Sequence, residues 1–410
     1  MQFTKYLFLS GLSAVLMASC GEPKTQEAPA PQSLHERILT LDTHVDIPLN
    51  YMTEVDPGWP TEAQVDLPKM VAGGLDAAFL IVYTPQTPLS EQGYKEAAEI
   101  ALTRYRAIQQ LIIQYPDRTA LAYTAADVRK YVGEGRRAIL IGMENAYPLG
   151  PDLDQLDLWA RRGVRYVGIT HFGHNQFGDS SNLKDWDESD ALHGGLSPLG
   201  RRLVAKLNDL GVMVDVSHAA KSTMMQATAM SRVPVIASHS GVIGMAKSAR
   251  NLDDEQLRAL AANGGVVQLV ALGAYVKAPS AEQAAFAAEI EAKYNVKTSA
   301  DVEKLPEAER AALLVDRETL RAMEPPASVS DYVDHIDYAV KVAGIDHVGI
   351  ASDFDGGGGI VGWQNASETP NVTAELLKRG YSEEDIAKIW GGNLLRVMEA
   401  VEAGRAGPKR

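Results

Sequence analysis

Histidines and carboxylates end a series of apolar, strand-like runs in this chain, and this recurrence restricts the folds that the chain can adopt. The residues at these endings are His44, Asp46, Glu144, His171, His218, His239 and Asp353. When parallel strands close into a barrel, the carboxyl ends of all strands meet at one face. Side chains of these types, gathered at one point, can hold a cation over an open cleft. His44 and Asp46 follow the same run, so the seven residues mark six endings. One such ending means little, but six together are hard to explain by packing.

Strand-like and helix-like segments alternate from about residue 34 onward. Eight apolar runs are candidate strands, at 38–43, 76–82, 138–143, 164–170, 212–217, 233–238, 265–270 and 346–351. Helical patterns lie between them, for example at 94–114, 152–162, 198–210, 219–230 and 253–262. Gly163, Gly211 and Gly264 stand where three of these helices would end. Eight βα repeats predict an α/β fold, the (β/α)8 or TIM barrel. A doubly wound open sheet is the alternative, but it would not readily gather ligands from six strand ends.

Residues 276–330 make the chain longer than a minimal barrel requires. This stretch separates the seventh and eighth candidate strands and is rich in Ala, Glu, Lys and Arg. It predicts extra helices on a long connection between these two strands. They could form part of a lid, a dimer contact or a solvated elaboration of the barrel.

The N-terminus has the pattern of an export signal. Lys5 gives it a positive start, and the apolar run YLFLSGLSAVLM is too short to indicate a spanning helix. Small residues precede Cys20, the only cysteine, so residues 1–19 resemble a bacterial lipoprotein signal with Cys20 as the lipidation site. An ordinary secretory signal with an incidental cysteine is the alternative. Residues 20–33 are polar and Pro-rich, as a tether would be, and lead into a domain at 34–405.

Charge and composition exclude several classes of partner. The formal net charge is −14 and hydrophobic residues make up 46% of the chain, so a large core is available. An acidic protein of this kind does not bind nucleic acid through a broad basic face. We expect membrane contact only through the N-terminal lipid anchor, with the domain exported to the bacterial cell envelope or periplasm.

The spacing of the candidate ligands suits metal binding. His44 and Asp46 are two residues apart, so they project to the same side of an extended segment. Glu144 follows a buried run, where a carboxylate is costly unless it is neutralised. A structural ion pair could neutralise it, but with the other ligands nearby a carboxylate bridging two cations is favoured. His218 and His239 end consecutive strands and could share one ion.

Seven short motifs, taken together, are similar to those of one enzyme family. HVD, GMEN, the histidine of GITHFGHN, DVSH, SHS, ARN and SDFDG occur in the order seen in the membrane (renal) dipeptidase family, peptidase family M19. The resemblance runs from about residue 38 to Val397, and implies a barrel of the metal-dependent amidohydrolase type with two zinc ions. One departure is visible, because Asn145, Ala146 and Tyr147 stand where the family often has glycines.

The resemblance implies a role for each matching residue. One zinc would be held by His44, Asp46 and Glu144, and the other by Glu144, His218 and His239. His171 would contact substrate and stabilise the tetrahedral intermediate, and Asp353 would be the acid/base. Arg250 would hold the substrate's terminal carboxylate, whereas without the resemblance a structural ion pair would explain it equally well.

The expected function is zinc-dependent hydrolysis of dipeptides by a metal-bridging hydroxide. The family implies broad specificity that includes some D-residues at the C-terminal position. Hydrolysis of a cyclic amide or lactone is the alternative reaction, and a non-catalytic periplasmic binding protein is a third reading. A homodimer is a further expectation from the resemblance, since family members commonly dimerise.

Overall fold

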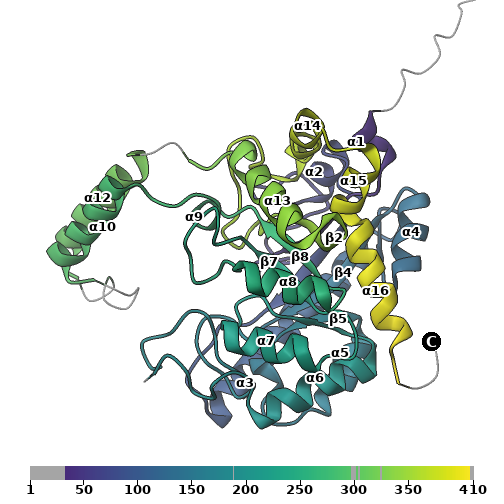
Figure 1. Ribbon diagram of the computed structural model, residues 1–410, viewed down its shortest axis with the longest axis horizontal. Helices are drawn as coiled ribbons and strands as arrows, with labels where there is room; N and C mark the ends of the chain where they lie inside the picture. The colour runs from purple at the N-terminus through teal and green to yellow at the C-terminus, as the bar shows by residue number, and fades with distance from the viewer. Residues whose placement is uncertain (1–32, 188, 297–301, 303–304, 324–325, 407–410) are drawn as a thin grey trace, which may run out of the picture.

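Eight parallel strands form a nearly closed barrel with helices outside it (Figure 1). The computed structural model describes residues 33–187, 189–296, 302, 305–323 and 326–406. The strands follow one another around the barrel as β1 (Leu41–Val45), β2 (Ala77–Tyr83), β4 (Arg137–Glu144), β5 (Val164–Gly168), β6 (Met213–Asp215), β7 (Ile236–Ser240), β8 (Val266–Val270) and β9 (Val348–Ala351). The TIM-barrel prediction is confirmed, and the open-sheet alternative is wrong. The expected signal peptide, Cys20 and the tether up to residue 32 lie outside the described residues.

The first and last strands meet just beyond their carboxyl ends. Val45 forms a parallel bridge with Phe354, and the Asp46 amide donates to the Phe354 carbonyl at 2.9 Å. The Asp353 amide in turn donates to the His44 carbonyl at 3.1 Å. This closure places His44 and Asp46 beside Asp353, although about 300 residues separate them in the chain.

All eight predicted strands differ from the observed bounds at one end or both, and for two of them the reason can be identified. β7 begins at Ile236 instead of residue 233, and Pro234, which lacks a backbone N–H, lies in the part that the strand does not use. β6 ends at Asp215 instead of residue 217, shortly before His218 takes a left-handed φ of 64°. The sequence patterns also missed β3 (Thr119–Leu121), which pairs with the first three residues of β4. A strand of three residues is too short to show a periodic pattern.

The helices agree more closely with the sequence patterns. Long helices cover the outside of the barrel: α3 (Glu91–Gln114), α4 (Ala125–Gly133), α5 (Gln155–Arg162), α6 (Pro198–Leu210), α7 (Lys221–Met230), α8 (Asp254–Ala262), α13 (Val329–Ala343), α14 (Pro370–Lys378) and α16 (Asn393–Ala403). Shorter helices are α1 (Leu34–Arg37), α2 (Leu67–Ala72), α9 (Gly273–Val276) and α15 (Glu383–Ala387). Gly163 and Gly211 cap α5 and α6 with left-handed φ values of 107° and 69°, as their positions in the sequence predicted.

Apolar side chains fill the inside of the barrel away from the strands' carboxyl ends. Phe79 and Tyr166 lie in this interior with ring centroids 5.0 Å apart. The same cluster continues onto Leu394, Val397 and Met398 of α16. The barrel is therefore a packed core on this side, and a functional cavity is left for the carboxyl end.

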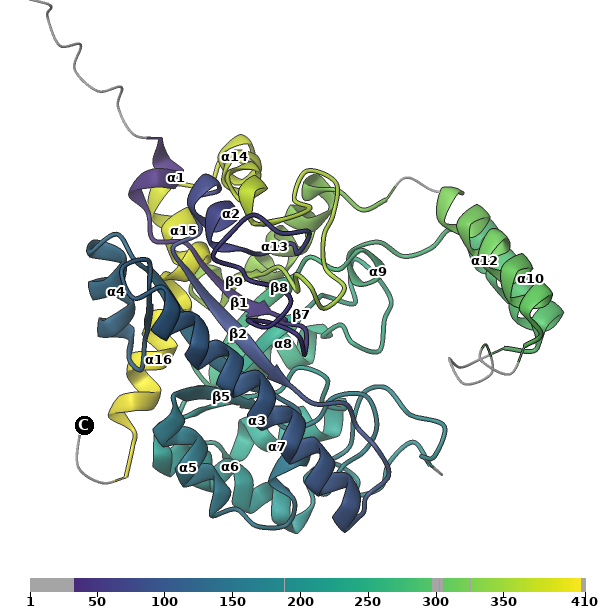
Figure 2. The ribbon, with the colours of Figure 1, turned by 180° about the vertical axis from the view of Figure 1, so that it is seen from behind.

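The segment between β8 and β9 contains extra helices, as predicted. α10 (Ala281–Tyr294) and α12 (Glu307–Ala322) form a hairpin that projects from the barrel in both views (Figures 1 and 2). The hairpin has a small apolar cluster of its own, which includes Ile290, Tyr294 and Leu313. Within the described residues, no helix has both the length and the apolar character needed to cross a bilayer.

Candidate active site

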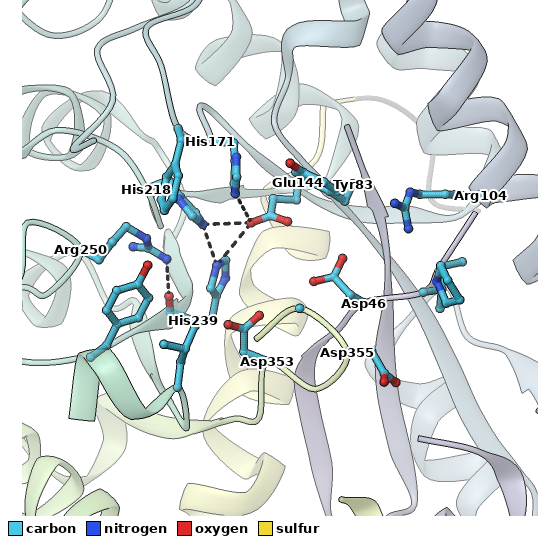
Figure 3. A pocket seen from close by; sticks show the side chains of 16 residues that line it. Asp46, Tyr83, Arg104, Glu144, His171, His218, His239, Arg250, Asp353 and Asp355 are labelled. Atoms are coloured by element: carbon cyan, nitrogen blue, oxygen red, sulfur yellow. Dashed lines mark hydrogen bonds and ion pairs between the residues drawn. The ribbon is translucent and has the colours of Figure 1, made fainter. Parts of the chain in front are cut away.

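A cavity of about 400 Å³ opens at the carboxyl ends of the strands (Figure 3). Seven of the eight residues singled out in the sequence line it: Asp46, Glu144, His171, His218, His239, Arg250 and Asp353. The eighth, His44, is 1% exposed and contacts Glu144 and Asp46 from beneath. The structure thus brings all eight residues to one place, and the cavity has a size that suits a small-molecule ligand.

Glu144, at the end of β4, lies at the centre of the cluster. Its Oε1 is 2.9 Å from His218 Nε2, 3.4 Å from His239 Nε2 and 3.8 Å from His171 Nε2. Its Oε2 is 3.6 Å from His44 Nε2. Oε1 therefore faces three imidazole nitrogens, and Oε2 faces the fourth.

The opposite side of the cluster is acidic. His44 Nε2 lies 3.6 Å from Asp46 Oδ2 and 3.9 Å from Asp353 Oδ1. Three groups of side chains have donor atoms within 4.8 Å of one another and could each hold a metal ion: His44, Glu144 and His239; Glu144, His171 and His218; and His44, Asp46 and Asp353. Because the groups share His44 and Glu144, the site is one continuous set of donors.

The charges of this cluster call for a cation. Burial alone would raise the pKa of Glu144, but His44, His171 and hydrogen bonds from His218 and His239 take that pKa well below its usual range. Burial would lower the pKa of His44, yet Glu144 and Asp46 raise it well above its usual range. Buried carboxylates of this kind are stable only with positive charge beside them. The donor set, nitrogen and carboxylate oxygen together, fits divalent ions of the zinc type.

Hydrogen bonds from behind fix how two imidazoles point. His44 Nδ1 donates to Tyr166 Oη at 3.0 Å, and Tyr166 Oη donates to the Thr43 carbonyl at 3.1 Å. His239 Nδ1 donates to Ser238 Oγ at 2.9 Å, and Ser238 Oγ donates to Asp215 Oδ2 at 2.7 Å. Both rings are left with Nε2 toward Glu144, the arrangement that outer partners of metal-binding histidines enforce.

Strained backbone follows several of these strands. His218 and Asp353 have φ values of 64° and 58°, in the left-handed region that non-glycine residues seldom adopt. Such conformations cost roughly 1–3 kcal/mol each and cluster at functional sites. Gly356 shows a related constraint, because a Cβ there would lie 2.2 Å from Asp46 Oδ2 and 2.6 Å from Asp353 Oδ1. The turn after β9 therefore needs a glycine to bring its backbone against the cluster.

Asn145, which stands where the family that the motifs resemble often has glycine, is accommodated by the fold. Asn145 has a φ of 73°, a conformation that glycine adopts freely and asparagine tolerates better than most residues. Its Oδ1 accepts hydrogen bonds from the Tyr147 amide and Asn175 Nδ2, while its Nδ2 donates to the Thr84 carbonyl. A side chain thus occupies the space after Glu144 without moving the carboxylate out of the cluster.

His171 and Asp353 have opposite pKa shifts on either side of the cluster. Burial lowers the pKa of His171 to about 4, with Arg250 adding to the effect and Glu144 opposing it. Burial raises the pKa of Asp353 to about 8, and the charges of Asp46 and Glu144 add to this while His44 and Arg250 oppose it. A neutral imidazole can donate a hydrogen bond, and a carboxyl group of this pKa can exchange a proton near neutral pH.

Arg250 lies at the wall of the cavity in a fixed position. Its Nη2 donates to the His239 carbonyl at 2.9 Å, and its Cζ lies 5.5 Å from the Tyr275 ring centroid. Its Nε is buried with no hydrogen-bond acceptor among the described residues. A polar or anionic ligand in the cavity would add a partner to a guanidinium held in this way.

Other residues of the site were not singled out in the sequence. Tyr83, Arg104, Phe172, Leu272, Tyr275 and Asp355 line the cavity as well. Tyr166 escaped notice because it stands inside an apolar strand, where an aromatic residue is ordinarily core. Arg104 had one detectable signal, its place on the buried face of α3.

A sequence profile of one family matches almost the whole chain. The profile, membrane dipeptidase (peptidase family M19), covers residues 30–409. The chain belongs to this family. The resemblance that the motifs suggested is confirmed.

Solved structures and curated relatives agree with this membership. The probable dipeptidase PvdM from Pseudomonas aeruginosa is 38% identical, with a TM-score of 0.82 over 90% of this chain and 97% of that chain. Dipeptidase tcpJ of Claviceps purpurea is 32% identical over 352 residues, which is 84% of this chain and 71% of the relative. A metallo peptidase from Rhodobacter sphaeroides, solved with a phosphinate mimic of the dipeptide L-Ala-D-Ala, is 25% identical with a TM-score of 0.70 over 89% of this chain and 99% of that chain. The present protein, as a member of this family, is a metallo-dipeptidase.

Proposed function

We propose that this chain hydrolyses dipeptides with two zinc ions held at the mouth of the barrel. His44, Asp46 and Glu144 would hold one ion, and Glu144, His218 and His239 the other. The observation that carries the proposal is the position of Glu144, whose Oε1 faces the imidazoles of His218 and His239 and whose Oε2 faces that of His44. When bound, two such cations supply Lewis acidity, which makes water more acidic and polarises a carbonyl group.

Asp353 and His171 supply the proton transfer and the hydrogen bond of the reaction. The Asp353 carboxylate accepts a proton from the attacking water and then donates one to the leaving amine. Neutral His171 donates a hydrogen bond to the oxyanion that develops from the scissile carbonyl. The positions of both side chains on the cavity wall support these roles.

Arg250 gives the site its preference for dipeptides. Its guanidinium offers a planar, charged fork to the substrate's C-terminal carboxylate. A longer peptide would place its carboxylate beyond this fork, so the position of Arg250 measures substrate length. The relative from Rhodobacter sphaeroides was solved with a mimic of L-Ala-D-Ala, which supports including some D-residues at the C-terminal position.

Kinetics with a matched pair of substrates test this proposal. The wild-type protein, stripped with a chelator and reloaded stepwise, should reach full activity at two equivalents of zinc per chain. It should hydrolyse alanyl-alanine and discriminate strongly against alanyl-alanine amide, which lacks the terminal charge.

Arg250→Met should lose most of this discrimination, by roughly 10–100-fold in the ratio of kcat/KM values, the range for a hydrogen bond to a charged group. Hydrolysis of a cyclic amide or lactone, with no cleavage of any dipeptide, would contradict the proposal.

We further propose that the protein is exported and anchored in the bacterial envelope by a lipid on Cys20. The apolar run and the small residues before Cys20 support this. Cell fractionation checks it, since Cys20→Ser should move the enzyme from the membrane fraction to the soluble envelope fraction. An unchanged distribution would exclude the lipid anchor.

A further inference from the structure

An arginine occupies the barrel-facing stripe of α3, where an apolar side chain is expected. The stripe contains the buried residues Ala97, Ala101, Ile108 and Leu111, and Arg104 stands between them at the same spacing. Residues three and four apart share one face of a helix, so Arg104 points inward with its neighbours. Placing a cation on such a face is costly unless the cation gains a partner.

The Arg104 guanidinium reaches the active-site cavity without a fixed anionic partner. It lines the cavity, and its Cζ lies 5.5 Å from the Tyr83 ring centroid. Its Nε is buried and has no hydrogen-bond acceptor among the described residues. Asp46 and Glu144 attract it, but in the described part of the chain no carboxylate oxygen comes within 4.0 Å of it. Arg104 is therefore not explained as an ion-pair support for the ligand Asp46.

Arg104 and Arg250 lie on opposite sides of the histidine and carboxylate cluster (Figure 3). With the substrate's C-terminal carboxylate at Arg250 and its scissile carbonyl at the cluster, the N-terminal residue extends toward Arg104. Tyr83, which also lines the cavity, lies between Glu144 and Arg104. The Tyr83 ring makes a cation–π contact with the guanidinium on one side.

We propose that Arg104 is a specificity-determining residue that binds an acidic side chain on the N-terminal residue of the dipeptide. Dipeptides that begin with glutamate or aspartate are then the preferred substrates. The planar guanidinium matches a carboxylate, and partial exclusion of water strengthens the pair. This inference rests on the proposed function, because the substrate direction is set by Arg250.

The test compares substrates that have the same shape and differ only in charge. Wild-type enzyme should favour glutamyl-alanine over glutaminyl-alanine by roughly 10–100-fold in kcat/KM, mainly through KM, as a charge-assisted hydrogen bond would. Arg104→Met should remove this preference, so that within this variant the kcat/KM values for glutamyl-alanine and glutaminyl-alanine become nearly equal. Arg104→Lys should retain part of the preference, and Arg104→Glu should shift it to lysyl-alanine.

Three results would overturn the inference while leaving the proposed function intact. The first is equal turnover of glutamyl-alanine and glutaminyl-alanine by the wild-type enzyme, and the second is an unchanged ratio in folded Arg104→Met. The third is an equal loss with every dipeptide and with lower zinc content, which would assign Arg104 to positioning Asp46. A failure of the proposed function would look different, since the wild-type enzyme would then cleave no dipeptide, alanyl-alanine included.

Discussion

Hydrogen bonds behind the cluster fix which nitrogen of His44 and His239 faces Glu144. Tyr166 holds His44, and Ser238 with Asp215 holds His239. Tyr166 and Ser238, which contact the two imidazoles directly, lie inside β5 and β7 and not at the ends of these strands, so the site depends on contacts one layer deeper in the barrel. Outer partners of this kind raise the basicity of a ligand and hold its orientation.

Replacing Tyr166 should weaken metal binding without disturbing the fold. Tyr166→Phe keeps the ring that packs on Phe79 and removes the hydroxyl group, which accepts the His44 Nδ1 proton and donates to the Thr43 carbonyl. We expect a loss of about 10–100-fold in zinc affinity or activity, the usual effect of losing an outer partner. Competition with a chromogenic chelator measures the affinity.

A second tyrosine provides the matched control for this variant. Tyr338→Phe removes a hydroxyl group that donates to Asp254 on the outside of the barrel, so zinc affinity should stay at the wild-type value. Equal zinc affinity in Tyr166→Phe and Tyr338→Phe would show that the bond to His44 has no influence on the site.

Sequence reasoning found the residues whose position along a strand reveals them. Glu144 and Asp353 each follow an apolar run, and the barrel rule alone places such residues together. Tyr166 and Arg104 could not be recognised in the same way. Their roles depend on contacts with residues that are far away in the sequence. The alternation of strands and helices along the chain does not predict which of these residues come close together.

Short elements around the barrel depend on a few buried polar contacts. His35 of α1 is an example, because its Nδ1 lies 2.6 Å from Thr373 Oγ1 in α14 and its Nε2 lies 2.9 Å from the Gly73 carbonyl after α2. Sequence patterns located the long helices well, but α1 and α2 have four and six residues, too few for a periodic pattern. Such short helices are stabilised by tertiary contacts more than by propensity.

The stability of this corner should depend on pH through His35. Burial lowers the pKa of His35, while the hydrogen bond to the Gly73 carbonyl and the charge of Asp76 oppose this. Since the pKa in the folded protein lies below the value of about 6.5 in the unfolded chain, the unfolded state binds more protons as the pH falls. The contribution of neutral His35 is therefore complete above about pH 6.5 and is lost as the pH falls through the folded pKa.

Thermal unfolding at a series of pH values measures this effect. As the pH falls below about 6.5, Tm of the wild-type protein should decrease more steeply than Tm of His35→Gln, which has no titrating group at this position. Parallel curves for the two proteins would remove His35 as the source of the pH dependence.

The molecule as a whole combines an acidic chain with a cavity that carries two arginines. The net charge is −14, yet Arg104 and Arg250 both line the active-site cavity. Local charge at a cleft guides small ligands more than net charge does, and these two guanidinium groups are the part of the cavity that would attract the anionic dipeptides proposed above. The α10–α12 hairpin projects away from the barrel, and a lid, a dimer contact and a solvated elaboration all stay open as its role. The eight βα repeats in the sequence predict that β1 and β9 close the barrel. They do not predict the backbone hydrogen bond between Asp46 and Phe354, because the register of two strands is set by the packing of their side chains.

The most direct test of the account compares zinc-loaded wild-type protein with zinc-loaded Glu144→Gln on a panel of dipeptides, with metal content measured for both. Glu144→Gln keeps the shape of the side chain and removes the charge that would bridge two ions. The account predicts that the wild-type protein holds two zinc ions and cleaves dipeptides. The variant should lose several kcal/mol of transition-state stabilisation, roughly a thousandfold in rate, together with bound zinc. Equal rates and equal zinc content in the two proteins would contradict the central claim.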